Sequence, residues 1–162
     1  MSDFSSSGTT DPAGGDGWRI DRHEPASDTV VQGLRQCLEA HNAAVADVQA
    51  NSRSMTWVVR DAAGELIGGL AGEIRYGWLH IRLMWVNPER RGAGAGRALL
   101  GRAEQVAREN ALLGLVTDTS SFQAPGFYTR HGFAVIGELP DLPPGHTTYY
   151  MAKRFDDPPQ DD

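Results

Sequence analysis

The amino-acid sequence predicts a mixed α/β domain, in which helices flank a mainly antiparallel sheet of about six or seven strands. Segments with two-residue apolar alternation, typical of strands, are interleaved with segments whose apolar residues recur every three or four positions, typical of helices. Along the chain the order is strand, helix, three strands, helix, strand, short helix and two strands, which favours a layered α/β fold. The length of 162 residues suits one domain with one core.

The first half of the predicted domain contains one strand, one helix and three more strands. Ser27 and Asp28 are residue types that cap helix N-termini, and the apolar residues that follow, up to Asn42, recur at helical spacing. The polar stretch from there to Ser52 is ambiguous. Segments rich in β-forming residues and separated by turn residues predict the strands. The expected strands are 18–22, 55–60, 66–75 and 78–86.

The strand 78–86 shows a clear two-residue alternation. We expect its apolar residues to share one face of the sheet and the remaining side chains to share the other. The apolar set is Leu79, Ile81, Leu83 and Trp85, and the second set is His80, Arg82 and Met84. The prediction is therefore one uniformly apolar face and one face that carries a histidine and an arginine.

The second half contains a helix, a strand, a short helix and two last strands. The helix follows a glycine-rich segment and continues to about Asn110, and Gly132 marks the end of the short helix. The expected ranges are 112–119 for the strand, 127–130 for the short helix, and 133–139 and 147–154 for the last strands.

The two ends of the chain differ in composition from the part between them. Residues 1–17 are rich in Ser, Gly, Thr and Asp, and together with residues 156–162 they carry seven of the 21 acidic residues and none of the 15 basic ones. Such segments bury too little apolar surface to offset the entropy of ordering. We expect a disordered N-terminal tail at 1–17, a folded domain at 18–155 and an acidic C-terminal tail at 156–162.

Composition also argues against several classes of function. The folded part is close to neutral, whereas a nucleic-acid-binding domain usually has a basic excess, so we expect no nucleic-acid partner. No segment approaches the ~20 apolar residues of a membrane span and no secretory signal is present, so we expect no membrane partner and a cytoplasmic location. Cys37 is the single cysteine, which excludes an intramolecular disulfide and a cysteine-based zinc site, and we expect no metal.

The glycine-rich segment V-N-P-E-R-R-G-A-G-A-G-R-A-L-L joins the strand 78–86 to the following helix. The first amides of a helix lack intrahelical partners and carry partial positive charge, and bare glycine backbone lets phosphate oxygens reach them. The segment adds positive side chains to the same place. Its glycines and arginines are Gly92, Gly94, Gly96, Arg90, Arg91 and Arg97. This arrangement predicts a site for a diphosphate.

Other interpretations of this segment fit its spacing less well. A nucleoside-triphosphate loop requires Lys and Ser or Thr after the last glycine, and neither follows Gly96. A dinucleotide-binding loop requires Gly-x-Gly-x-x-Gly, and here the third glycine comes one position early, although Asp118, 22 residues after Gly96, could serve as the ribose-binding acid. A flexible turn is the last alternative, and it does not account for the flanking arginines.

Two segments of the chain share the motifs of one known family, in the family's order. Residues 91–96, R-G-A-G-A-G, match an Arg/Gln-x-x-Gly-x-Gly/Ala motif, and residues 124–133, A-P-G-F-Y-T-R-H-G-F, match an Ala-x-x-x-Tyr-x-x-x-Gly-Phe segment. Both are typical of the GCN5-related N-acetyltransferases (GNAT), which the chain resembles from about Trp18 to Phe155, with features of a bacterial, largely uncharacterised branch. The resemblance implies the GNAT fold, in which strands 4 and 5 splay apart and acetyl-CoA, the cosubstrate, lies in the gap.

The resemblance also implies which residues contact acetyl-CoA. The implied contacts are Met84, Trp85 and Val86 for pantetheine, and Arg91, Gly92, Ala93, Gly94, Ala95, Gly96 and Arg97 for the pyrophosphate. Tyr128 stands at the family's general-acid position, where it also contacts the cosubstrate. Ser121 stands seven residues earlier, where many relatives have Asn, so this contact departs from the family pattern.

Amine acetylation needs a base, because an alkylammonium of pKa ~10 is not a nucleophile, and it benefits from an acid for the departing thiolate. Tyr128 is the candidate acid. His80, with an ordinary pKa of ~6.5, and Glu73 on the preceding strand, acting through a water, are the candidate bases. A water chain without a single base is the third alternative.

We therefore expect an enzyme, an acetyl-CoA-dependent N-acetyltransferase that acts on a primary amine of a small molecule by direct attack on the thioester. Two rival functions stay open: a non-catalytic acyl-CoA-binding module, and a protein or peptide N-acetyltransferase. The last two strands often pair across dimers in the family, so a homodimer is a further expectation. Candidate acceptor contacts are His41, Asn42, Trp57, Trp78 and His146.

Overall fold

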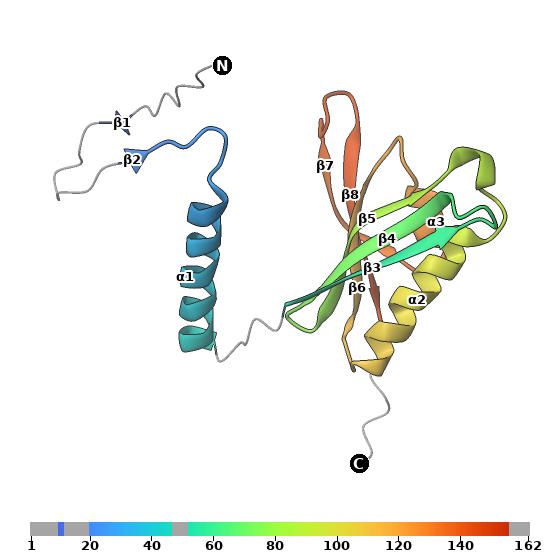
Figure 1. The fold of residues 1–162 in the computed structure, drawn as a ribbon, viewed down its shortest axis with the longest axis horizontal. Helices are drawn as coiled ribbons and strands as arrows, with labels where there is room; N and C mark the ends of the chain where they lie inside the picture. Colours follow the sequence, from blue (N-terminus) through green and yellow to red (C-terminus); the bar gives the residue numbers. More distant parts are fainter. Residues whose placement is uncertain (1–9, 12–19, 47–51, 156–162) are drawn as a thin grey trace, which may run out of the picture. The chain divides into compact units, whose positions relative to one another are not determined.

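The computed structural model describes residues 10–11, 20–46 and 52–155 (Figure 1). The chain divides into two units, residues 1–49 and residues 50–162. In the first unit, β1 (Thr10–Asp11) pairs antiparallel with β2 (Ile20–Asp21), and α1 (Asp28–Ala46) follows.

The first unit agrees with the sequence pattern in its helix and adds a strand at its start. α1 begins at Asp28, as the capping residues predict, and extends to Ala46. The strand expected at 18–22 is present as β2, and its partner β1 falls inside the segment expected to be a disordered tail. The rest of that segment, the stretch 47–51 and the acidic tail lie outside the described residues, so disorder in the two tails stays a prediction.

The second unit is built around a six-stranded sheet with the strand order β3-β4-β5-β6-β8-β7. Its elements are β3 (Arg53–Arg60), β4 (Leu66–Arg75), β5 (Trp78–Val86), the 3-10 helix η1 (Pro88–Arg90), α2 (Ala95–Glu109), β6 (Gly114–Ser120), α3 (Pro125–Arg130), β7 (Ala134–Pro140) and β8 (Thr147–Arg154). Neighbouring strands pair antiparallel, except that β5 and β6 are parallel. The predicted α/β class and the order of elements in this unit are confirmed.

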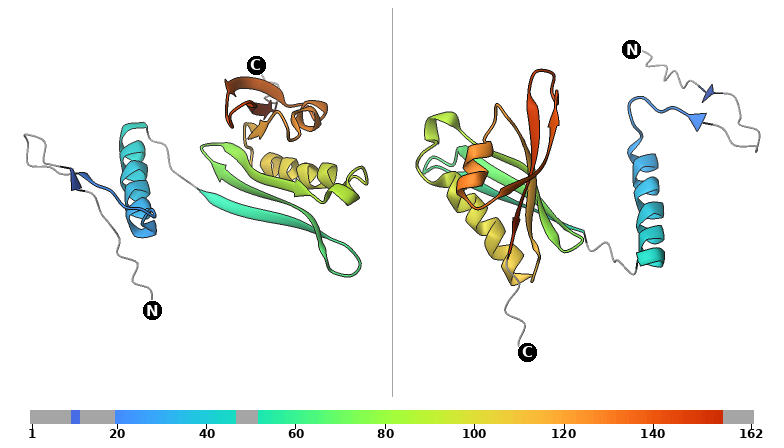
Figure 2. Two further views of the ribbon diagram at one scale, coloured as in Figure 1. Left: turned by 90° about the horizontal axis from the view of Figure 1, so that it is seen from above. Right: turned by 180° about the vertical axis from the view of Figure 1, so that it is seen from behind.

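α2 lies along one face of this sheet and forms the core with it (Figure 2). Helical spacing places its small and branched residues on the side that meets the sheet. The buried apolar residues are Leu70, Leu79, Ile81, Leu99, Leu100, Ala103, Ala107, Leu115, Tyr128, Phe133, Met151 and Phe155. The candidate acid Tyr128 is therefore a core residue whose ring position is set by packing.

A β-bulge interrupts the pairing of β4 with β5. Gly72 pairs with Ile81 and Ala71 pairs with Leu83, so Arg82 is an extra residue that has no pairing partner on β4. A bulge of this kind shifts the two-residue alternation of the longer strand by one position. Every side chain of β5 after the bulge therefore faces the side of the sheet opposite to the one that strict alternation predicts.

The prediction of one uniformly apolar face on β5 is wrong beyond Ile81, because the bulge reverses the alternation there. The Leu83 side chain is 72% exposed and the Trp85 side chain 48% exposed. Met84 and Val86 instead pack against the core. As a result Met84, which the alternation assigns to the polar face, lies on the same side of the sheet as Tyr128.

At Gly114, the first residue of β6, the backbone lies very close to both neighbouring strands. A Cβ at this position would lie 2.2 Å from the backbone oxygen of Lys153 and 2.8 Å from the Trp78 ring. We predict that Gly114→Ala lowers the free energy of unfolding by about 2–3 kcal/mol, because the backbone must shift to relieve the overlap. Urea denaturation measures this change.

Gly101→Ala is the matched control for Gly114→Ala. Gly101 lies inside α2, and a Cβ there would meet no atom within 4 Å. The control should raise the free energy of unfolding by roughly 0.5–1 kcal/mol, because alanine is the better helix former. Equal stabilities of the two variants would contradict the packing described for Gly114.

Candidate functional site

The parallel pairing of β5 and β6 is short and leaves a gap between the two strands. The ladder has three rungs, Trp78–Gly114, Leu79–Leu115 and His80–Val116. Within the described residues no rung follows, although β5 continues to Val86 and β6 to Ser120. Just beyond the last rung, the Thr117 hydroxyl donates a hydrogen bond to the carbonyl oxygen of Ile81 at 3.3 Å. Facing edges of extended backbone without a ladder can bind an extended ligand as an added strand.

The glycine-rich loop follows β5 at the open end of this gap and leads into α2. Gly92 and Gly94 have left-handed backbone conformations, with φ of 84° and 89°, and a Cβ on either would meet no atom within 4 Å. Gly94 is the N-cap of α2, and it supplies no side chain to the first amides of the helix. Uncapped amides beside open backbone can bind an anion.

Gly96 has a different role from the two glycines before it. A Cβ on Gly96 would lie 3.4 Å from the Phe127 ring and 3.6 Å from the methyl group of Met84. A methyl group at this position would thus make ordinary van der Waals contact with α3 and β5, whereas Gly92 and Gly94 border open space.

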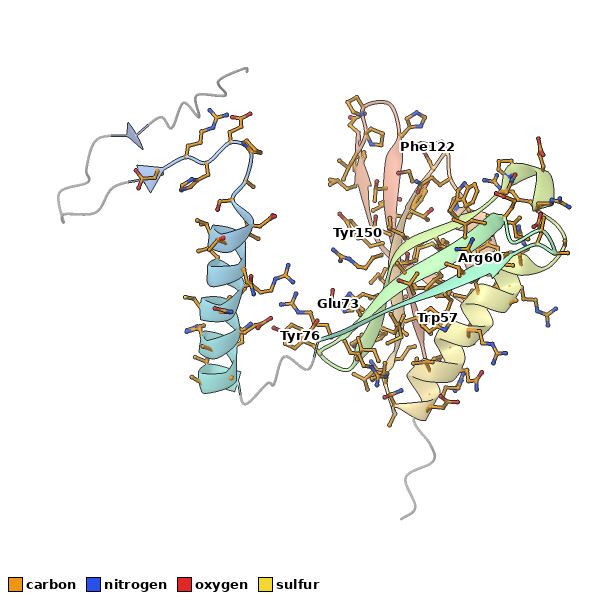
Figure 3. All side chains as sticks on the ribbon, viewed as in Figure 1. Trp57, Arg60, Glu73, Tyr76, Phe122 and Tyr150 are labelled. Atoms are coloured by element: carbon orange, nitrogen blue, oxygen red, sulfur yellow. The ribbon has the colours of Figure 1, made fainter. Side chains whose placement is uncertain are left out.

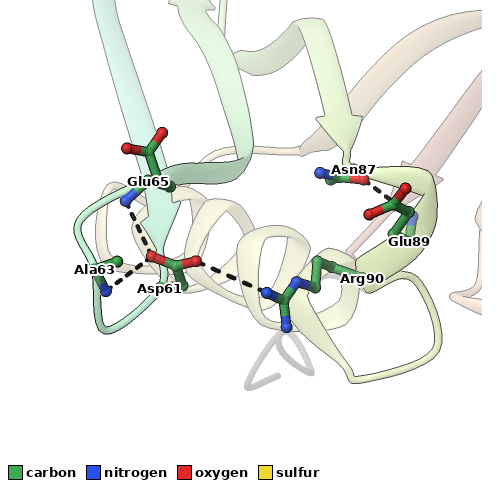
Figure 4. Close-up of polar contacts among 6 residues, drawn as sticks. All are labelled: Asp61, Ala63, Glu65, Asn87, Glu89 and Arg90. Atoms are coloured by element: carbon green, nitrogen blue, oxygen red, sulfur yellow. Dashed lines mark hydrogen bonds and ion pairs between the residues drawn. The ribbon is translucent and has the colours of Figure 1, made fainter.

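Side-chain contacts before the loop fix its path (Figure 4). Asn87 accepts a hydrogen bond from the amide of Glu89 at 3.0 Å and so caps η1. The Arg90 guanidinium lies 3.9 Å from the Asp61 carboxylate in the turn between β3 and β4. Asp61 also accepts hydrogen bonds at 3.0 Å from the amides of Ala63 and Glu65. Arg90 is thus directed toward the turn between β3 and β4. The sequence pattern had grouped it with Arg91 and Arg97 as positive charge around the glycines.

The other two arginines of the loop differ from each other in their surroundings. Arg91 donates from Nε to the carbonyl oxygen of Val86 at 3.2 Å, so its side chain folds back on the end of β5. Arg97 instead lines a hollow of about 460 Å³ beside α2, together with Arg130, His131 and Lys153. Glu104 also lines this hollow and pairs with Lys153 at 2.6 Å, so positive charge here comes from Arg97 on α2 and Arg130 on α3.

Tyr128, on α3, is buried beside the gap, with an exposed fraction of 6%. Its hydroxyl donates to the Met84 sulfur at 3.7 Å. Burial raises the pKa of Tyr128 above 10.0, the Thr117 hydroxyl partly opposes this rise, and the negative charge of Asp118 raises it further. Tyr128 is therefore protonated at neutral pH and can donate a proton to a group in the gap.

His80 and Glu73 lie directly opposite each other on β5 and β4. Because Leu79 and Ile81 face α2, strand alternation directs His80 to the other side of the sheet. Figure 3 shows Glu73 near the turn between the two strands. Burial lowers the pKa of His80 below 6.5, the charge of Arg82 lowers it further, and the charge of Glu73 raises it. His80 is therefore a neutral base at neutral pH, at the last rung before the gap.

Ser121, which aligns with a family asparagine, contacts the start of β8 and the residue before it. Its hydroxyl accepts a hydrogen bond from the amide of Thr147 at 3.3 Å and lies 3.5 Å from Nδ1 of His146. Its amide donates to the carbonyl oxygen of Thr147 at 2.8 Å. These contacts join the loop after β6 to the start of β8, and they engage the hydroxyl with protein groups.

The structure brings together some of the expected site residues and separates others. Met84, Gly96 and Tyr128 lie in mutual contact or share neighbours on the α2 side of the sheet. His80 and Glu73 lie on the opposite face, and Trp85 is turned outward by the bulge.

Sequence reasoning missed two residues of this site. Thr117, which bonds across the end of the ladder, looks like an ordinary strand residue, and no local pattern marks it. Arg130 lies two residues after Tyr128, inside the motif segment 124–133. A basic side chain on this short helix, close to the candidate acid, could have indicated its place beside the hollow.

No group of three or more His, Cys, Asp or Glu side chains in the described ranges is placed to hold a metal ion. No helix among them has the length and apolar character needed to span a membrane.

Comparison with known proteins gives consistent matches. The family model described as Acetyltransferase (GNAT) family matches residues 23–133. A blasticidin-S acetyltransferase of Streptomyces morookaense is 47% identical over 93 residues, which cover 57% of this chain and 68% of the relative.

Solved structures with the same fold agree with this family match. The crystal structure of an acetyltransferase from Bacillus cereus has a TM-score of 0.73 and 29% identity, and covers 80% of this chain and 94% of its own. That of a nourseothricin acetyltransferase has a TM-score of 0.57 and 32% identity, with 62% of this chain and 65% of its own covered.

The surroundings of His80 predict how its titration responds to its charged neighbours. We expect an NMR titration of the His80 imidazole to have a midpoint below 6.5. Arg82→Gln should raise that midpoint, because it removes a positive charge that opposes protonation, and Glu73→Gln should lower it, because it removes a stabilising negative charge. Shifts of the same sign in both variants would contradict the arrangement.

Proposed function

The chain belongs to the acetyltransferase (GNAT) family, and we propose that it transfers the acetyl group of acetyl-CoA to a primary amine of a small molecule. The observation that carries this proposal is the gap between β5 and β6, which ends at the open glycine loop and has the buried Tyr128 beside it. A thioester on a long pantetheine arm with a diphosphate at its end suits an extended gap that ends in an anion-binding loop. Family membership implies acetyl-CoA as the acetyl donor.

The residues along the gap fit acetyl-CoA segment by segment. Backbone groups of β5 from Met84 to Val86 bind the pantetheine arm, and the amides of residues 92–97 bind the diphosphate. Arg97 and Arg130 line the neighbouring hollow and supply positive charge for the phosphorylated nucleotide end, whereas Lys153 in the same hollow is paired with the Glu104 carboxylate at 2.6 Å. The Ser121 hydroxyl accepts a hydrogen bond from the Thr147 amide and keeps a proton that it can donate to the cosubstrate, the contact expected at this position.

His80 and Tyr128 handle protons on the two sides of the gap. His80 accepts a proton from the acceptor ammonium, directly or through a water, because its lowered pKa keeps it neutral at neutral pH. The freed nitrogen attacks the thioester carbonyl carbon, so a C–N bond forms and the C–S bond breaks. Tyr128 gives its hydroxyl proton to the departing sulfur. The second nitrogen proton restores Tyr128, and His80 releases its proton to solvent, so each turnover releases one proton.

The acceptor that we propose is a small amine-bearing molecule of the kind for which two similar proteins are named. Those proteins are acetyltransferases of blasticidin-S and of nourseothricin. Glu73, beside His80, gives the acceptor side of the sheet a carboxylate that favours a cationic amine. The rival function, a non-catalytic acyl-CoA-binding module, has no use for a buried acid beside the gap.

The first test concerns the glycine loop. We predict that Gly94→Glu abolishes acetyl-CoA binding measured by calorimetry, because a carboxylate would enter the open space at the uncapped amides and repel the diphosphate. Gly145→Glu is the matched control, since Gly145 has φ of 78°, also meets no atom within 4 Å at its Cβ position, and lies in the loop between β7 and β8. Equal losses in both variants would mean that the loop is not the diphosphate site.

The second test concerns turnover. We predict that Tyr128→Phe lowers kcat with a panel of small primary amines by about 10²-fold and leaves acetyl-CoA affinity unchanged, because it removes the proton donor and keeps the ring. Tyr149→Phe, which removes a hydroxyl from a partly buried tyrosine on β8, is the control and should keep wild-type kcat. Acetyl-CoA binding without turnover in the wild type, for every amine tried, would favour the binding-module alternative.

A further inference from the structure

We propose that Asp118 and Tyr150 together bind a second positive group of the acceptor, so that the preferred acceptor is a small dication: an amine to be acetylated and another cationic group one short spacer away. This inference rests on the proposed function and deepens it, because it names the class of acceptor. The two residues contribute a negative charge and an aromatic ring from neighbouring strands, and neither lies in a motif segment.

Strand register places Asp118 and Tyr150 on the same face of the sheet. They are direct partners in the antiparallel ladder of β6 and β8, and the Cβ atoms of such partners lie about 4.5–5.5 Å apart. Leu115 of β6 belongs to the core beside α2, so alternation directs Asp118 to the opposite side. Figure 3 shows Tyr150 and Glu73 on that side. A carboxylate and a ring therefore leave the sheet next to each other, on the face away from α2.

This pair lies beside the open part of the gap, on the face that carries the candidate base. Val116 is the partner of His80 in the last rung, and Asp118 follows Val116 by two residues on the same face. Two residues of a strand span about 6–7 Å, so Asp118 lies about that far beyond the last rung. An acceptor nitrogen next to His80 and a second group next to Asp118 are thus separated by a short spacer.

Both side chains are accessible to a ligand. Asp118 is exposed, and no ion pair between residues that the structure describes includes it. Tyr150 is 42% exposed, and its partner on β7 is Gly137, which has no side chain to cover the ring. The edge of the ring lies 3.9 Å from the position that a Cβ on Gly137 would take. A carboxylate beside an accessible ring suits an ammonium or guanidinium group, by charge and by cation–π attraction.

The arginines on this face leave the pair open to an external cation. Arg75 and Arg154 lie at the closed end of the ladder, over aromatic rings at 4.8 and 5.9 Å from the ring centroids. Arg82, the bulge residue, lies at the start of the open part, and within the described ranges it makes no ion pair with Asp118. An acceptor with a carboxylate would bind Arg82 instead, so the sign of the second group on the acceptor is a direct test.

Exposed apolar side chains across the gap suit the spacer between the two groups. Because of the bulge, Leu83 and Trp85 of β5 face the same side as His80, and they are 72% and 48% exposed. Methylene groups that lie on these side chains leave water, which favours binding. The acceptor that fits this face has an apolar spacer with a positive group at each end.

Three amines with the same number of carbon atoms test the sign of the second group. Cadaverine has an ammonium at its far end, pentylamine a methyl group and δ-aminovalerate a carboxylate. With acetyl-CoA and the full-length chain, we expect kcat/KM for cadaverine, corrected for its two equivalent amines, to be about 10-fold above that for pentylamine. We expect δ-aminovalerate to be a poorer acceptor than pentylamine, because Asp118 repels its carboxylate.

Substitutions assign the preference to the pair. Asp118→Asn should lower kcat/KM for cadaverine to about the value for pentylamine and leave pentylamine unchanged, a split that a general structural defect would not produce. Tyr150→Leu should lower kcat/KM for cadaverine by about threefold, whereas Tyr150→Phe keeps the ring and the preference. Glu138→Gln is the matched control, since Glu138 is an exposed acid directly opposite Tyr149 in the ladder of β7 and β8, and it should leave both amines unchanged. Circular dichroism checks that each variant is folded.

The outcomes separate this inference from the proposed function. Acetylation of cadaverine and pentylamine at equal kcat/KM, or a cadaverine preference that survives Asp118→Asn, overturns the inference and keeps the acetyltransferase proposal. A preference for δ-aminovalerate also overturns it, in favour of Arg82. If the wild type acetylates none of the three, an NMR titration with cadaverine decides. Shifts of the Tyr150 ring signals that Asp118→Asn abolishes support the cation site and count against the proposed function, and the absence of shifts overturns the inference.

Discussion

Hydrogen bonding between β5 and β6 stops at the rung His80–Val116, and the geometry of the site follows from this stop. The two strands stay in one body because α2 packs across them and the Thr117 hydroxyl bonds to the Ile81 carbonyl at the end of the ladder. Backbone groups that lose their ladder partners in a partly buried place favour any ligand that restores those hydrogen bonds. An extended arm carrying a thioester is such a ligand, and the glycine loop lies at the end of the strand where its diphosphate would be held.

The bulge in β5 is the second feature on which the site depends. One extra residue, Arg82, turns Met84 inward so that its sulfur meets the Tyr128 hydroxyl. The same turn brings the Met84 methyl group to 3.6 Å from the Cβ position of Gly96. A side chain larger than alanine at position 96 would therefore press on Met84 and on Phe127 of α3.

Burial sets the protonation of both candidate catalytic groups in the direction that acetyl transfer needs. Desolvation disfavours the charged form of any side chain, so it raises the pKa of Tyr128 and lowers that of His80. The tyrosine keeps a proton to give and the histidine keeps a lone pair to use. Burial is the largest cause of both pKa shifts. The charge of Asp118 adds to the rise for Tyr128, and the charge of Arg82 adds to the fall for His80.

Much of the fold was predictable from the sequence, because helix and strand periodicity, capping residues and turn glycines act over a few neighbouring residues. The bounds of β4 and β5 are those that alternation and turn residues predict. The open glycine loop in front of a helix was predictable for the same reason. Periodicity indicates which residues form an element, and it says nothing about the partners of that element.

Tertiary structure alone decided the features that depend on partners far away in sequence. The bulge exists because β5 pairs with β4 in a register that leaves Arg82 out, so the inward direction of Met84 could not be read from alternation. Arg90 turns away from the loop because Asp61 lies in a turn 29 residues earlier. The Ser121 hydroxyl accepts a hydrogen bond from Thr147, which lies 26 residues later at the start of β8. The sequence by itself determined the elements and the open glycine loop before α2, whereas long-range pairing determined which side chains face the gap, since a side chain's direction depends on the strand opposite it.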